Sequence, residues 1–160
     1  LRRLTFLPHA SITELDAATR DAPARRLAQR ALAAEVTGLV HGRQAVAQAE
    51  AASQAMFGRA DLSDLTPQTL AGVMSTLPHV VVDPSAEAPT VADLLTQTGL
   101  TPSKGAARRA ATEGGVYVNN ARVHDADSQV DRGTLVHGRW LVLRRGRRTV
   151  AGVDMGWGPA

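Results

Sequence analysis

The residues with the clearest chemical role lie between positions 101 and 120, in the sequence TPSKGAARRAATEGGVYVNN. On a helix, Lys104 and Arg108 are four residues apart and therefore share one face, with Arg109 beside them. Ser103 precedes them, where its hydroxyl group and the first free amide groups of the helix offer hydrogen bonds to an anion. Fixed cations along a rigid edge, together with such donors, are what a phosphate backbone requires. The pattern predicts a phosphate-binding helix.

A preceding helix would hold this edge in place. Thr90 and Asp93 fit a capping box, and Gly99 ends the helix that follows them. Its apolar face would pack against the small side chains of the second helix, which we expect to span residues 104–113. These small side chains lie mostly opposite the cations and belong to Ala106, Ala107, Ala110 and Ala111.

A β-hairpin is predicted directly after the second helix. Residues 116–118 and 121–123 are short β-prone runs, and Asn119 and Asn120 between them tolerate the positive φ of a tight turn. Two further strands are expected at 134–136 and 140–143. A basic turn at 144–148 follows them. Thr149 and Val150 would add an edge strand. The glycine-rich residues 151–160 predict a flexible tail.

The first half of the chain is typical of a helical domain. Ser11 and Glu14 fit a capping box for a helix at 12–19, and Pro23 suits the first turn of the next one. That helix would turn an apolar face inward and end at Gly42. Its expected inward residues are Leu27, Ala31, Leu32, Val36, Leu39 and Val40. Further helices are expected at 43–57 and after Thr66.

The sequence therefore predicts an α+β protein with four parts. They are a helical domain at 1–82, a linker at 83–89 that is rich in proline and acid, a second domain at 90–150 and the tail at 151–160. The second domain would consist of two helices packed on a short antiparallel sheet.

Charge is distributed unevenly along the chain. Residues 1–89 hold 8 basic and 9 acidic side chains, a net charge of −1, whereas residues 90–160 hold 10 and 6, a net charge of +4. This asymmetry favours an acidic partner for the second half alone. Lys104 is the only lysine, which is typical of a GC-rich genome.

Several classes of protein are disfavoured by composition. Cysteine is absent, which excludes disulfides and thiolate metal sites. The five histidines are scattered, and the acidic loop at Asp125, Asp127 and Asp131 lacks the glycine and final glutamate of a calcium loop, so we expect no metal. No segment suits a bilayer span or a secretion signal, and we expect a cytoplasmic protein without membrane contact. The first residue is Leu, which suggests an excised or processed piece.

The run Pro-Ser-Lys-x-x-Ala-Arg, followed by Gly-Gly-Val-Tyr-Val-Asn, resembles the alpha-L RNA-binding motif. In that motif, two helices and a hairpin bind structured RNA. The resemblance implies that Ser103, Lys104, Arg108, Asn119 and Arg122 face RNA. Arg109 matches less strictly, and Asn120 stands where relatives often have Gly. Together with the basic turn, the predicted RNA-binding residues are Ser103, Lys104, Arg108, Arg109, Asn119, Asn120, Arg122, Arg144, Arg145, Arg147 and Arg148.

The order of segments narrows this resemblance. Residues 28–42, 52–58 and 138–146 resemble the region that follows the catalytic domain in bacterial, actinobacterial-like tyrosyl-tRNA synthetases. The resemblance implies binding of tyrosine tRNA, at its long variable arm and anticodon side, and no DNA. Neither the His-x-Gly-His nor the Lys-Met-Ser-Lys-Ser motif of the catalytic domain is present. We therefore expect no catalysis and no cofactor here, because ATP and Mg²⁺ belong to that domain. We expect a monomeric fragment of a homodimeric parent ligase.

Other functions stay open at this point. A stand-alone RNA-binding or ribosome-associated factor with an alpha-L domain would bind ribosomal RNA as tightly as tRNA. A purely structural module would show no salt-dependent RNA binding. A pseudouridine synthase would need a catalytic aspartate domain after the motif, where only a short tail follows.

Overall fold

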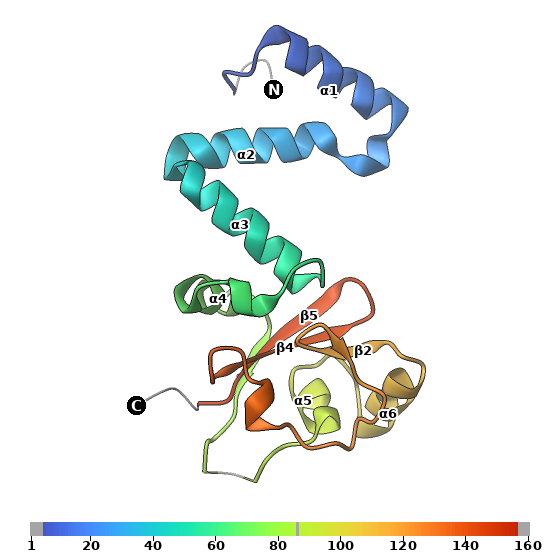
Figure 1. The fold of residues 1–160 in the computed structure, drawn as a ribbon. Coiled ribbons are helices and arrows are strands. Elements are labelled where there is room, and N and C mark those ends of the chain that lie inside the picture. The colour runs from blue at the N-terminus through green and yellow to red at the C-terminus, as the bar shows by residue number, and fades with distance from the viewer. Residues whose placement is uncertain (1–4, 86, 157–160) are drawn as a thin grey trace. The chain divides into compact units, whose positions relative to one another are not determined.

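The structure is a computed structural model in which residues 5–85 and 87–156 are described. The chain divides into two compact units, residues 1–50 (unit 1) and residues 51–160 (unit 2). Figure 1 labels their helices and strands. This division differs from the predicted boundary at 83–89.

Unit 1 consists of helices alone. It holds α1 (His9–Asp21), the short 3-10 helix η1 (Pro23–Arg25), α2 (Leu27–His41) and the start of α3 (Arg43–Met56). Gly42 ends α2 with φ +85°, as predicted. The predicted start at Ser11 is wrong, because α1 begins at His9, after Pro8, without a side-chain cap. Pro23 begins η1, and α2 starts only at Leu27.

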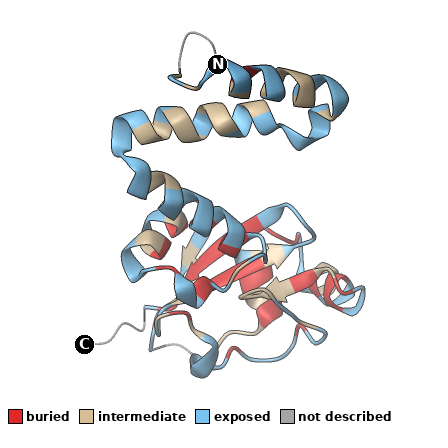
Figure 2. Cartoon of the chain, turned by 45° about the horizontal axis from the view of Figure 1, so that its top comes forward, coloured by how far each residue is buried: buried red, intermediate tan, exposed pale blue. Residues whose placement is uncertain are grey.

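Unit 1 buries few of its described side chains. Among residues 5–50 only Ile12 is buried, and Figure 2 shows α1 and α2 almost entirely as exposed or intermediate. The predicted inward face of α2 is therefore not covered: Leu39 is 56% and Val40 68% exposed. The reason is that α1 packs on α2, whereas Leu39 at the far end lines a pocket with Phe6 and the start of α3 and is not covered by a packed core.

Unit 2 is built on a five-stranded sheet in the order β1-β5-β4-β2-β3. All neighbours are antiparallel except β1 and β5, which are parallel. The strands are β1 (His79–Val81), β2 (Val116–Val118), β3 (Ala121–Arg122), β4 (Trp140–Arg145) and β5 (Thr149–Asp154). The helical elements are η2 (Leu62–Asp64), α4 (Pro67–Met74), α5 (Val91–Gln97), α6 (Lys104–Thr112) and η3 (Arg132–Thr134). The α+β class is confirmed.

Side chains on the central strands alternate between two apolar cores. Leu141 and Leu143 of β4 pack with α5 and α6, whereas Val142 between them packs with α4 and the end of α3. Such alternation follows from the two-residue repeat of a strand. The sheet thus lies between two helical layers, and buried residues concentrate there (Figure 2).

Strand β5 lies inside the sheet and not at its edge. It pairs with β1 on one side and β4 on the other, and residues 150–155 are buried. The predicted edge strand and the predicted flexible tail are therefore wrong for residues 149–155. Arg139 holds the end of the strand through two hydrogen bonds to Asp154, at 2.8 and 2.6 Å. Residues 157–160 of the predicted tail lie outside the described residues.

The described residues of the predicted linker, 83–85 and 87–89, lie within unit 2 and not at the boundary between the units. They connect β1 to α5, and β1 belongs to the sheet through its pairing with β5. The predicted strand at 134–136 is also absent: Arg132–Thr134 form η3, because the Asp131 side chain accepts a hydrogen bond from Gly133 N. Of residues 134–136, only Val136 makes a β-bridge, and its partner is Trp140.

We expect hydrogen exchange to separate the two units. Amide groups of β4 and β5 are buried in a sheet between two cores, so they should exchange only on global unfolding of unit 2. Amide groups of α1 and α2 should exchange roughly a hundredfold faster or more, because little apolar surface protects them. Mass-spectrometric exchange of the whole chain measures both. Equal protection of α2 and β5 would contradict this assignment.

Candidate RNA-binding site

Helix α6 is positioned by a capped start and an alanine face. The Ser103 hydroxyl accepts a hydrogen bond from Ala106 N at 3.2 Å, which makes Ser103 the N-cap. Ala107, Ala110 and Ala111 are buried against α5 and the sheet. These small side chains let the two helices approach closely, and they leave the polar face of α6 directed to solvent. The alanine face opposite the cations was predicted.

Two predicted cations on this face have carboxylate partners. Lys104 Nζ lies 2.5 Å from Asp93 of α5, and Arg108 Nε donates to both oxygens of Asp127, at 2.9 and 2.8 Å. The side chains of Lys104 and Arg108 remain 56% and 54% exposed. An incoming phosphate group would therefore have to share or replace these carboxylates. The sequence pattern did not reveal the partners, because the pairs are formed between different elements.

The carboxyl group of Asp93 links the starts of α5 and α6. It accepts hydrogen bonds from the amide and hydroxyl groups of Thr90 and pairs with Lys104. The hydrogen bond from Lys104, followed by that from Thr90, lowers the pKa of Asp93 from 3.8 to about 2. The predicted capping box is confirmed, because Thr90 also accepts a bond from Asp93 N.

The Asn119–Asn120 turn is confirmed, with φ values of 46° and 66°. Both side chains are engaged within unit 2. The Asn119 amide group donates to Thr134 O and accepts from Val142 N, and Asn120 donates to Ala55 O at 2.7 Å. The two asparagines fix the hairpin against neighbouring elements, so an RNA contact from this turn would come from backbone atoms. Oδ1 of Asn120 has no hydrogen-bond partner among the described residues, but it is buried and cannot reach RNA.

Arg122 closes the end of α6. Its guanidinium group donates to Gly114 O at 3.0 Å and to Glu113 O at 3.5 Å. Gly114 has φ +73°, and a Cβ atom there would overlap the Arg122 guanidinium group. Arg122 therefore stabilises the helix end, although its side chain is exposed enough to contact a ligand as well.

The basic turn divides into engaged and unengaged arginines. Arg144 lies over the Tyr117 ring, 4.0 Å from its centroid, and donates to Gly146 O. Arg145 donates to Leu100 O at 3.0 Å. The side chains of Arg147 and Arg148 are exposed and make no hydrogen bond or ion pair with any described residue, and the same is true of the Arg109 side chain on α6.

The turn and the helix are connected. Gly146 N donates to Gly115 O at 2.8 Å, which ties the β4–β5 turn to the segment that follows α6. The structure thus places the predicted residues on two joined elements of unit 2. Lys104, Arg108 and Arg109 stand on α6, and Arg147 and Arg148 stand on the turn. The two asparagines and Arg122 support these elements.

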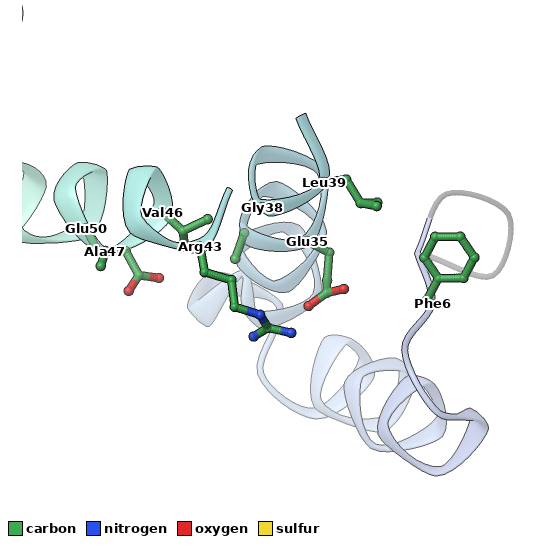
Figure 3. A pocket seen from close by; sticks show the side chains of 9 residues that line it. Phe6, Glu35, Gly38, Leu39, Arg43, Val46, Ala47 and Glu50 are labelled. Carbon is green, nitrogen blue, oxygen red and sulfur yellow. The ribbon is translucent and has the colours of Figure 1, made fainter. Parts of the chain in front are cut away.

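A separate pocket in unit 1 has the wrong charge for phosphate. It has a volume of about 460 Å³ and is lined by α2, α3 and Phe6. Its charged residues are Glu35, Arg43 and Glu50, a net charge of −1. Figure 3 shows the ends of Arg43 and Glu35 reaching toward the same side of this pocket. Mixed charge of this kind neither attracts nor orients an RNA backbone.

Two further classes of site are absent from the part of the chain that the structure describes. No three His, Cys, Asp or Glu side chains there gather closely enough to hold a metal ion. None of the described helices combines the length and apolar composition that crossing a bilayer needs.

Substitution of Gly114 tests the contact with Arg122. Gly114→Ala should destabilise the protein by about 1 kcal/mol or more beyond Gly99→Ala, because it displaces a charged donor from two carbonyl groups. Gly99 is the matched control, since it has the same φ of +73° but no atom within 4 Å of the place that a Cβ atom would take. Urea unfolding measures both variants. Equal losses would show that Arg122 does not need this space.

The Asp93 carboxyl group should make stability depend on pH. Its pKa in the folded protein lies below the ordinary value of 3.8, so its contribution is complete above about pH 4 and is lost as the pH falls toward 2. Asp93→Ala should cost about 1 kcal/mol at pH 7, as expected for a lost cap, and the cost should shrink below pH 4. Thermal unfolding of Asp93→Ala and of the control Asp64→Ala across this range measures the difference. A cost that is constant down to pH 2 would contradict the assignment.

Comparison with known proteins agrees with the resemblance found in the sequence. Residues 69–151 match the family model described as the tyrosine–tRNA ligase SYY-like C-terminal domain. The tyrosine–tRNA ligases of Streptomyces griseus and Thermobifida fusca are 48% and 49% identical over 98% and 96% of this chain. That of Corynebacterium diphtheriae is 50% identical over 96% of the chain.

The matched region is a minor part of these relatives. The chain spans 36% of the length of each of the three ligases. A solved structure titled "Solution structure of tyrosyl-tRNA synthetase C-terminal domain" is 26% identical, with a TM-score of 0.48, and covers 60% of this chain and 95% of that one. On the evidence of the family model and the identities to the three ligases, this chain belongs to the family of tyrosine–tRNA ligase C-terminal domains.

Proposed function

We propose that this chain binds tyrosine tRNA as the non-catalytic part of a tyrosine–tRNA ligase and thereby supports aminoacylation. Unit 2 would bind the long variable arm and unit 1 the anticodon side. The observation that carries the proposal is the set of exposed cations on α6 and the β4–β5 turn, of which Arg109, Arg147 and Arg148 have no partner among the described residues.

The geometry suits a phosphate backbone. Phosphate groups recur along an RNA strand, and cations on two joined rigid elements can meet several of them at once. Hydrogen bonds between Gly146 and Gly115 and between Arg145 and Leu100 fix the turn before RNA arrives. Little conformational freedom of the side chains and the loop is then lost on binding.

The paired cations can also take part. Exposed ion pairs contribute only about 0–1 kcal/mol, so a phosphate group can displace Asp93 from Lys104 or Asp127 from Arg108 at small cost. Both cations are more than half exposed and therefore accessible. Competition with these carboxylates would lower the affinity for isolated phosphates and favour an RNA that presents several together.

The ligase reaction itself would reside in the rest of the parent protein. ATP and Mg²⁺ would bind there, and this chain would supply affinity and orientation for the tRNA. The parent is proposed to be a homodimer through that remaining part, and the chain alone a monomer. Placement in the cytoplasm follows from the role in translation and is part of the same proposal.

Charge neutralisation tests the RNA-binding assignment. The double variant Lys104→Gln with Arg108→Gln should weaken binding of tyrosine tRNA and lower the slope of log K against log salt by roughly one to two, since each phosphate contact contributes about one. The control Arg20→Gln with Arg43→Gln removes the same charge from unit 1, so it should leave unchanged the part of the affinity that depends on the long variable arm. Fluorescence anisotropy at several salt concentrations measures affinity and slope.

A second tRNA separates the competing functions. Shortening the long variable arm should weaken binding to the unmodified chain and remove the difference between the chain and its α6 double variant. Unchanged affinity and slope in the double variant would overturn the placement of RNA on α6. Binding of a ribosomal RNA fragment as tight as that of tRNA would favour the stand-alone RNA-binding factor.

A further inference from the structure

A small pocket lies between the end of α6 and the β4–β5 turn. Its volume of about 300 Å³ is at the lower end of the ~300–1,000 Å³ that small-ligand pockets occupy. It is open to solvent on one side. The residues that line it are Leu100, Ala110, Glu113, Gly115, Arg145, Gly146 and Thr149.

The walls of this pocket are fixed by hydrogen bonds. Gly146 N donates to Gly115 O at 2.8 Å, and Arg145 Nη1 donates to Leu100 O at 3.0 Å. Leu100 and Ala110 are only 5% and 8% exposed, so they form a firm apolar floor. The pocket is therefore formed before any ligand binds.

An acceptor and a donor face this space without pairing with each other. Glu113 is exposed at the C-cap of α6, and within the described residues its carboxylate makes no ion pair or hydrogen bond. Arg145 lines the same pocket and uses only Nη1 in its bond to Leu100 O. Its other guanidinium donors make no hydrogen bond to the described part of the chain, and Thr149 adds a hydroxyl group at the rim.

An acidic side chain is unexpected on a surface that binds phosphate. Glu113 lines a pocket with residues of the β4–β5 turn, which also carries Arg147 and Arg148. Its negative charge lowers the positive potential there and so opposes a backbone contact. A carboxylate does have a role where RNA is recognised by its bases, because unstacked bases present N–H groups on their Watson–Crick edges.

We propose that this pocket binds an unpaired guanine base of the RNA, an inference that rests on the proposed RNA-binding function. The Glu113 carboxylate accepts hydrogen bonds from N1–H and the 2-amino group, and Arg145 donates to O6 or N7. Leu100 and Ala110 contact the face of the base, while Arg147 and Arg148 hold the adjoining phosphate groups. Adenine carries an acceptor at N1, which the carboxylate repels.

The direction in which one substitution changes the affinity for RNA distinguishes a base contact from simple electrostatics. Glu113→Gln removes a negative charge, so it should leave the affinity for RNA without guanine equal or higher. The same substitution should reduce the preference for guanine, because a neutral amide cannot accept both N–H groups as the carboxylate does. Asp64→Asn is the control, since it makes the same change of charge on η2, away from the pocket residues.

The probes are three eight-nucleotide RNAs of uridine that carry a central guanosine, inosine or adenosine. The full chain should bind the guanosine probe about tenfold more tightly than the adenosine probe, as a good bidentate contact allows, with inosine in between because it lacks the 2-amino group. In Glu113→Gln the guanosine preference should fall below about threefold, and in Asp64→Asn it should be unchanged. Competition against labelled RNA in fluorescence anisotropy measures the ratios.

The outcomes separate this inference from the proposed function. Equal, salt-sensitive binding of the three probes by the unmodified chain would overturn the guanine pocket and leave RNA binding in place. A guanosine preference that survives in Glu113→Gln would also overturn it. Failure to bind tyrosine tRNA in the same assay would overturn the proposed function and the pocket together.

Discussion

The structure of unit 2 depends on the pairing of its last strand, β5, between β1 and β4. One face of β5 contributes Ala151 and Val153 to the core with α5 and α6, and the other contributes Val150 to the core with α4. Gly152 leaves room for Met74, whose Sδ would lie 2.6 Å from an added Cβ atom. Neither helical layer has a complete surface to pack on until this strand is in place.

The candidate site is rigid because its residues stand on elements that are joined to that sheet. The β4–β5 turn carries Arg147 and Arg148 directly between the two central strands, and Gly115 joins it to the end of α6. At the same end, Arg122 on β3 donates to the carbonyl groups of Gly114 and Glu113, which directly follow the helix. The cations therefore stand on elements that move together, and this is the condition under which several weak phosphate contacts add to a specific one.

Features set by neighbouring residues were predictable from the sequence. The capping box of Thr90 and Asp93, the N-caps Thr66 and Ser103 and the Asn119–Asn120 turn all follow from local backbone and side-chain chemistry. Features decided by distant parts of the chain were not. The six residues of β5, which lie close to the final glycines, look like the start of a tail, because nothing local states that β1 will pair with them in parallel.

The same distinction between local and distant partners explains which features of the candidate site could be predicted. The motif predicted that cations stand on α6, and the structure places them there. It could not predict which are paired, because Asp127 reaches Arg108 across 19 positions of sequence. Nor could it predict that Asn119 and Asn120 bind Thr134, Val142 and Ala55, since those partners belong to other elements. The family pattern thus identifies the surface. Which of its residues are paired within the protein and which are free to bind RNA depends on the packed fold.

The presence of both paired and unpaired cations affects how such a surface would select one RNA. Cations with internal carboxylate partners gain little from a single phosphate group, because one ion pair replaces another. Unpaired arginines gain more, and they do so with any nucleic acid, since backbone contacts carry no sequence information. A surface that neutralises part of its charge internally therefore limits its affinity for arbitrary RNA. It leaves discrimination to the spacing of the remaining cations and to contacts, such as that proposed for Glu113, which a wrong base would leave unpaired.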